Sequence, residues 1–222
     1  MKREITDAFL LMEEEFHFLM SVRGQRRYVG YPAKGDAPSR QESLNCLYGL
    51  VKKGYVTCTG EHFRVEERMA ACIDGVGAAE TVLCAERADG RIPARFLYLK
   101  ENAPATVCQR QPLKEDVLKL WQLPLKDWAG MLMEDGFFEE NREEPPTQIT
   151  GEETPGCRIC TLRKYSNRKA DELGNFCWMK KEEAFVARIT EDGVCREIPS
   201  DEKGLPQLLR QWALPGSSGQ NR

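Results

Sequence analysis

The chain has 222 residues, of which 30% are charged and 41% hydrophobic, and its formal net charge is −3 at pH 7. A chain of this length can bury a core without metal or disulfide support. Its slightly acidic balance gives no support to nucleic-acid binding, which usually leaves a basic surface. The acidic run from Glu13 to Glu15 excludes a signal peptide, and no apolar run approaches the roughly 18 residues of a membrane helix. Nine cysteines without a signal peptide then indicate the reducing cytoplasm.

The first elements are expected to be a strand over residues 4–11 and a helix over 13–22. Three glutamates suit the N-terminus of that helix, where the helix dipole favours negative charge. One long helix from Thr6 is the alternative, because apolar side chains also keep helical spacing at Phe9, Met12, Phe16 and Leu19.

Residues 39–77 follow the order of a winged-helix unit. Ser39 and Glu42 form a capping box, and Gly54 ends the helix. Short strands over 55–58 and 62–65 flank a turn that ends at Glu61, and a helix over 66–76 follows. The expected buried stripe of the first helix is Leu44, Leu47, Leu50 and Val51; the side chains expected on its surface are Tyr48, Lys52 and Lys53.

Nucleic-acid recognition by this unit is not expected. Bases are usually read from the N-terminal part of a recognition helix, whereas Lys52 and Lys53 lie at the C-terminal end. Glu61, at the tip of the hairpin, would repel phosphate. The unit is therefore predicted to be a packing module that resembles a winged helix.

Strands are predicted over 80–87, 91–101 and 105–111, the first two joined by an Asp89-Gly90 hairpin signal. Residues 113–123 are expected to form an amphipathic helix that buries Val117, Leu118, Leu120 and Trp121. Pro124 ends it, and a further helix is predicted over 125–138.

Residues 139–156 are acidic, contain three prolines, and form the best candidate for a linker. We therefore divide the chain into residues 1–138, the linker, a C-terminal part over 157–214, and a tail over 215–222. The C-terminal strands are predicted over 157–165, 175–181, 184–190 and 194–199, before a helix with an apolar face at Leu205, Leu208, Leu209 and Trp212.

The predicted fold class is α+β, with two antiparallel sheets and flanking helices. Both halves run strands, an Asp-Gly turn, a strand and a helix, so an internal pseudo-repeat is one hypothesis. The alternative is that any α+β chain with two antiparallel sheets has this order.

No catalytic, cofactor-binding or metal-binding residue is predicted. Cys157 and Cys160 form a C-x2-C pair without a second pair, and positions three apart on a strand should point to opposite faces. His17 and His62 have no motif attached. Residues 74–80 are expected to be a glycine-containing turn after a helix, the wrong order for a phosphate cradle. Arg23, Arg26 and Arg27 form the densest basic patch, either a phosphate or acidic-surface contact or a solvated loop.

The order of elements resembles that of type VII secretion chaperones of the EspG type. The matching stretches are CLYGLVKKGYV, the strand-rich segment from Thr81 to Gln111, GNFCWM, TEDGVCREIP and LPQLLRQW. The resemblance implies a cytosolic chaperone that binds helical-hairpin secretion substrates, although this chain is shorter than that family's usual members and its middle is trimmed.

The sequence thus favours a non-enzymatic cytoplasmic protein-binding module, without a cofactor and with a helical protein partner. The partner-binding residues are not identified. The alternative is a winged-helix transcriptional regulator with a C-terminal sensor domain.

Overall fold

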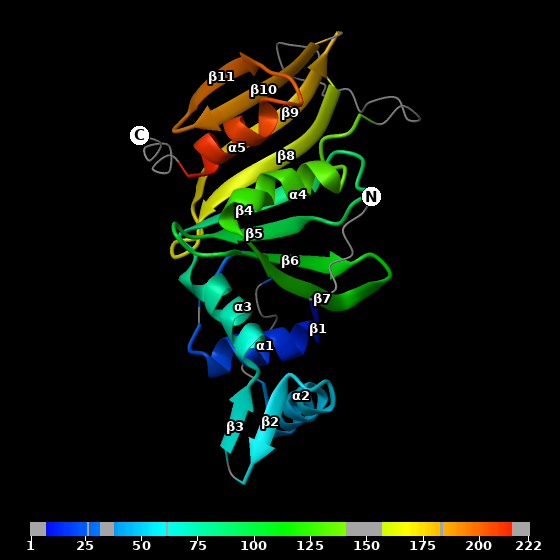
Figure 1. The fold of residues 1–222 in the computed structure, drawn as a ribbon, viewed down its shortest axis with the longest axis vertical. Coiled ribbons are helices and arrows are strands. Elements are labelled where there is room, and N and C mark those ends of the chain that lie inside the picture. Colours follow the sequence, from blue (N-terminus) through cyan, green and yellow to red (C-terminus); the bar gives the residue numbers. More distant parts are fainter. Residues whose placement is uncertain are drawn as a thin grey trace.

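The computed structural model describes residues 8–25, 27–31, 38–60, 62–140, 157–182 and 184–214. Within these residues, nine strands form one antiparallel sheet in the order β1-β7-β6-β5-β4-β8-β9-β10-β11, and two more form a small hairpin (Figure 1). Five α-helices accompany them, so the predicted α+β class is confirmed. None of the helices in this part of the chain is long and apolar enough to cross a membrane.

The chain enters the sheet at its edge through β1 (Phe9–Met12) and continues directly into α1 (Glu13–Val22). This confirms the strand-then-helix prediction for the described residues; residues 4–7 of the expected strand lie outside them. The Met12 N–H donates to the Glu15 carboxylate at 2.8 Å, which fixes the helix start. Phe16, Leu19 and Met20 on α1 are buried.

The next unit consists of α2 (Arg40–Lys52), β2 (Val56–Thr59) and β3 (His62–Val65), and it extends beyond the edge of the large sheet (Figure 1). The predicted capping box is confirmed: the Glu42 N–H donates to Ser39 Oγ, and the Ser39 N–H donates to the Glu42 carboxylate at 2.7 Å. Gly54 follows the helix at φ +74°, as predicted for a C-terminal glycine.

The predicted buried stripe of α2 is confirmed for only half of its residues. Leu50 is fully buried and Leu47 packs partly buried against the core, whereas Leu44 is 50% and Val51 38% exposed. The reason is that α2 packs through one narrow side, where a Cβ on Gly49 would lie 2.5 Å from the Glu15 carboxylate of α1. Tyr48, Lys52 and Lys53 are exposed, as predicted.

Helix α3 (Glu67–Ala78) is longer than predicted and includes most of the expected turn over residues 74–80. Gly75 lies inside α3, at a point where the helix packs closely on the sheet. A Cβ at this position would lie 2.2 Å from Thr106 Oγ1. The glycine thus allows close packing, and it does not mark a turn.

The first four-stranded meander comprises β4 (Thr81–Arg87), β5 (Arg95–Leu99), β6 (Ala105–Gln111) and β7 (Lys114–Leu123). Strand β7 overturns the predicted helix over 113–123. Its apolar side chains alternate between two buried faces, Leu118 and Leu120 on one and Trp121 on the other. A strand buried on both faces reads as a continuous apolar run, which imitates helical spacing. Beyond it lie η1 (Leu125–Asp127) and α4 (Trp128–Glu134).

The second meander comprises β8 (Cys157–Ser166), β9 (Glu172–Lys181), β10 (Ala184–Glu191) and β11 (Val194–Pro199), and is followed by α5 (Leu205–Ala213). The expected Asp192-Gly193 turn between β10 and β11 has positive φ at both residues. Strand β8 pairs with β4 from Thr81↔Ser166 to Arg87↔Cys160. The strands of the two halves therefore form one sheet, where the sequence predicted two.

Residues 141–156 of the predicted linker lie outside the described residues, and the division into separate parts stays a prediction. The pseudo-repeat also stays a prediction, although each half runs four antiparallel strands into a helix.

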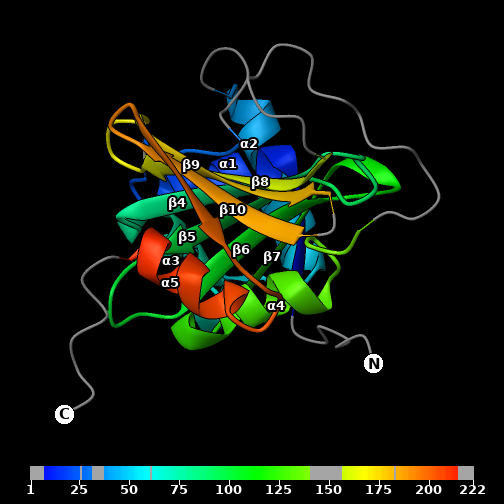
Figure 2. The ribbon, with the colours of Figure 1, turned by 90° about the horizontal axis from the view of Figure 1, so that it is seen from above.

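Two hydrophobic clusters lie on opposite faces of the sheet. One packs α4 and α5 against both meanders, around Trp128, Trp178 and Phe176. The other packs α1 and α3 against β1 and the first meander, around Phe16, Ile73 and Leu120. Figure 2 shows α4 and α5 on one side of the strands and α1 on the other. The second face of β8–β11 contributes only Tyr165, at its border, to these clusters among the described residues, and the hollow on that face is lined by strand residues without a helix residue.

Candidate functional site

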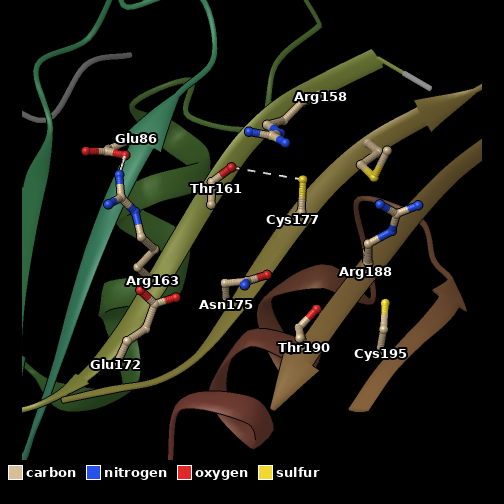
Figure 3. A pocket seen from close by; sticks show the side chains of 11 residues that line it. Glu86, Arg158, Thr161, Arg163, Glu172, Asn175, Cys177, Arg188, Thr190 and Cys195 are labelled. Carbon is tan, nitrogen blue, oxygen red and sulfur yellow. Dashed lines mark hydrogen bonds and ion pairs between the residues drawn. The ribbon is translucent and has the colours of Figure 1, made fainter. Parts of the chain in front are cut away.

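The helix-free face of the second meander contains a hollow of about 400 Å³, which we call the trough (Figure 3). Buried Cys177 and Met179 lie at its base. Its other lining side chains are polar or charged, apart from the thiol of Cys195: Glu86, Arg158, Thr161, Arg163, Glu172, Asn175, Arg188 and Thr190.

Strand register aligns these side chains in rows across the sheet. Thr161 pairs with Cys177, which pairs with Arg188. In the next row, Arg163 pairs with Asn175, which pairs with Thr190. Because directly paired residues project to the same face, each row offers hydrogen-bonding groups from three neighbouring strands.

A register shift in β8 between Arg158 and Cys160 adds Arg158 to this face. Without it, Arg158 and Thr161 would point to opposite sides, because they are three residues apart. The extra residue of the irregularity restores a common face and extends the trough along the strand.

Most of the positive charge in the trough is compensated. Arg163 donates to the Glu86 carboxylate, and this hydrogen bond raises the pKa of Arg163. Arg188 Nε donates to Glu197 Oε1 at 3.0 Å, and bonds from Lys181 and Arg188 lower the pKa of Glu197. Arg158 is exposed and pairs with no carboxylate among the described residues. The trough therefore offers paired charges and hydroxyl groups suited to binding a polar surface.

The two histidines lie away from the trough. His17 lies on α1. Its Nδ1 is 2.6 Å from the Tyr28 hydroxyl oxygen, and its Nε2 is 3.8 Å from Glu13 Oε1. Burial lowers the pKa of His17, while Glu13 and Glu14 oppose that shift. His62 is exposed on β3. Neither imidazole is positioned to activate the thiol of Cys177 or Cys195.

The argument from strand alternation for Cys157 and Cys160 is wrong. Cys157 pairs with Lys180 and Cys160 with Trp178, and these partners share a face, so the register shift brings both cysteines to one side. Burial raises the pKa of the Cys160 thiol. Among the described residues, no three histidine, cysteine or carboxylate side chains are grouped as a metal site.

The predicted basic patch is only partly described. Arg23 Nε donates to Asp74 Oδ1 at 2.9 Å, which attaches the end of α1 to α3. Arg27 is exposed, and Arg26 lies outside the described residues. Arg23 therefore forms an exposed ion pair between two helices, and the hypothesis of a phosphate-binding loop gains no support from it.

The order α2-β2-β3 agrees with the predicted elements of the winged-helix-like unit, whose identity stays a prediction. Glu61, the residue expected to repel DNA, lies outside the described residues. The Lys53 ammonium donates to the Leu10 carbonyl at 3.2 Å and also pairs with Glu15. One of the two lysines of the helix end is thus used to hold α2 against β1 and α1.

The sequence signal that could have located the trough is alternation in β8. Thr161 and Arg163 alternate with Leu162, which indicates a strand with one polar face. Cys177 and Met179 on β9 weaken this signal because they are apolar on the same face. Which face lacks a helix is a tertiary property that the alternation does not contain.

The fold is thus an α+β sheet protein with a helix-covered face and a half-covered face. In overall shape it is similar to a chain in the solved structure of the Mycobacterium tuberculosis type VII secretion system chaperone EspG5 in complex with the PE25-PPE41 dimer. The TM-score is 0.55 at 11% sequence identity, and the match covers 91% of this chain and 93% of that one. This likeness concerns the fold. No protein-family model and no curated protein matches the chain.

Proposed function

We propose that this chain is a non-enzymatic, cytoplasmic protein-binding module that holds a helical partner protein, as a secretion chaperone does. The fold likeness to a chaperone spans nearly the whole of both chains, which supports the proposal. A partner-binding role needs a large accessible surface, and it does not need converging acid, base and nucleophile groups.

The observation that carries the proposal is the helix-free face of β8–β11. Thr161, Asn175 and Thr190 present polar groups there, and Arg163 and Arg188 are held in place by carboxylates. Ordered charges on a rigid sheet are suited to recognition, because little side-chain entropy is lost when a partner binds.

Affinity capture from the native host with the full chain as bait tests the proposal. We expect one specific partner, and the purified partner should bind with 1:1 stoichiometry by calorimetry. The variant Arg158→Glu should weaken that binding about tenfold, as expected for a charge at a recognition surface.

Lys126→Glu is the matched control, because Lys126 is an exposed cation on η1, on the face that carries α4. This variant should bind like the wild type. Recovery of no specific partner, or equal loss in both variants, would count against the proposed function. A turnover of a small molecule that depends on Cys177 would replace it with an enzymatic one.

A further inference from the structure

The exposed side of α2 is an apolar helix face without a partner in the described part of the chain. Leu44 is 50%, Tyr48 72% and Val51 38% exposed, whereas Leu47 beside them packs partly buried against the core. The spacing of three and four residues places Leu44, Tyr48 and Val51 on one exposed side of the helix, with Leu47 at its border. Seven of the ten large hydrophobic side chains exposed in the described residues lie between Leu10 and Phe63, so this part of the molecule concentrates uncovered apolar surface.

The charges at this face have one sign. Arg40 begins α2 on the side of the apolar stripe, and Lys52 follows Val51 at its other end; both are exposed. Neither makes an ion pair with any residue that the structure describes. The single acidic residue of α2, Glu42, accepts the Ser39 N–H in the capping box.

We propose that the exposed face of α2 binds an amphipathic helix of another protein whose apolar stripe is bordered by acidic residues. This rests on the proposed function and names a second contact, distinct from the trough. Side chains three and four residues apart form ridges along the surface of α2. Such ridges fit best into the grooves of another helix. Acidic residues beside the partner stripe would meet Arg40 and Lys52, which favours an acidic over a basic partner.

A second copy of this chain fits the face less well. In an antiparallel pair of α2 helices, Leu44 would lie against Val51 of the second copy. Lys52 of one copy would then lie within about one helical turn of Arg40 of the other. A parallel pair would place each cation beside its own equivalent. Both symmetric arrangements bring like charges together on an apolar interface, which is unfavourable.

The direct test uses two synthetic amphipathic helices of about three heptads. They share a leucine stripe, bordered by glutamates in one and by lysines in the other. Titration of the full chain with each labelled peptide should give at least tenfold tighter binding of the acidic one. Double substitution Leu44→Ser with Tyr48→Ser should reduce that affinity at least tenfold. The control is Leu113→Ser, because Leu113 is 95% exposed on the turn between β6 and β7 and should bind like the wild type.

A charge exchange tests the polarity of the contact. Arg40→Glu combined with Lys52→Glu should reverse the preference, so that the lysine-bordered peptide binds more tightly. All substituted side chains are exposed, so circular dichroism should give unchanged folding and a melting temperature within a few degrees of the wild type. Equal binding of the two peptides, or a preference that the charge exchange leaves unchanged, would overturn the inference.

The native partner of the capture experiment separates this inference from the proposed function. If the Leu44→Ser, Tyr48→Ser variant binds that partner as tightly as the wild type, the α2 contact is wrong while the protein-binding function stands. A wild-type dimer that the same variant converts to a monomer would identify the occupant as a second copy and would also overturn the inference. If neither the wild type nor any variant captures a partner, the result counts against the proposed function. The titration with the acidic and basic peptides then tests the α2 contact by itself.

Discussion

The two meanders of the sheet, β4–β7 and β8–β11, share one face and differ on the other. On the shared face, α4 and α5 pack over a continuous apolar cluster that includes Leu97 and Trp178. On the other face, the first meander buries Tyr98 and Cys108 beneath α1 and α3, whereas the second keeps Arg163 and Thr190 in the trough. Similar strands therefore carry different residues according to whether a helix covers that face.

The boundary between the covered and the uncovered region is held by Asn167, at the turn after β8. Its side-chain oxygen accepts the Val29 N–H at 3.0 Å, and its nitrogen donates to the carbonyls of Val76 at 2.8 Å and Ala79 at 3.2 Å. One buried amide thus joins the loop after α1, the end of α3 and the second meander. Asn167 therefore lies where the helices α1 and α3, which cover the first meander, meet the second meander.

Truncating a buried side chain of α1, one of the helices that cover the first meander, should have the largest effect on the free energy of unfolding. Phe16→Ala deletes a fully buried ring of α1, and the lost burial together with the cavity should lower the free energy of unfolding by about 3–5 kcal/mol in a urea titration. Tyr48→Ala, at a ring that is 72% exposed, should change it by less than about 0.5 kcal/mol. Similar losses in both variants would mean that the two faces of the N-terminal region are not distinct.

Removing the Asn167 side-chain amide should have the next largest effect on the free energy of unfolding. Asn167→Ala leaves one N–H and two carbonyls without their partner, so the free energy of unfolding should fall by about 3 kcal/mol. Asn175→Ala, in the trough, is the matched control and should cost less than about 0.5 kcal/mol. Hydrogen exchange of the Val29 amide should accelerate only in the first variant; an unchanged rate would contradict the role of Asn167.

Arg163 and Lys164 are adjacent on β8 and point to opposite faces of the sheet, so substituting each in turn compares the stability contributions of the two faces. Lys164 faces α5, pairs with Glu191 and donates to the Trp212 carbonyl at 3.1 Å. Lys164→Met should therefore cost about 2 kcal/mol, since Glu191 loses a largely buried partner. Arg163→Met removes an ion pair whose side chains are 42% and 37% exposed, so its cost should not exceed about 1 kcal/mol. Thermal unfolding of both variants would measure the contrast, and the reverse order would refute it.

The smallest expected effect is a pH dependence in the covering layer. Burial lowers the pKa of His17 below its usual 6.5. The unfolded chain therefore binds this proton first, so that stability falls as the pH drops below about 6.5 towards the folded pKa. His17→Gln should remove this contribution, and the difference between the two stability curves from pH 8 to pH 5 measures it. Parallel curves, or a difference that grows in the other direction, would contradict the cause assigned to the shift.

Local chemistry determined much of the secondary structure from the sequence alone. The Ser39 and Glu42 capping box, the glycine after α2 and the Asp192-Gly193 turn depend on interactions within a few residues, so their patterns are sufficient. The strand-then-helix start at Phe9–Val22 was also predictable, because glutamates favour a helix N-terminus.

Long-range packing decided the rest. Strand β7 looked helical because both its faces are buried, and only pairing with β1 and β6 reveals its period. The apolar stripe of α2 looked like core, but only Leu47 and Leu50 meet the core, because α2 packs through one narrow side against α1. The trough depends on the β4–β8 pairing, on the register shift in β8 and on the absence of a helix over β8–β11 in the described residues. The sequence by itself determined which side chains form strands, caps and turns. Only the tertiary structure decided which of their faces are covered, because burial depends on elements far apart in the chain.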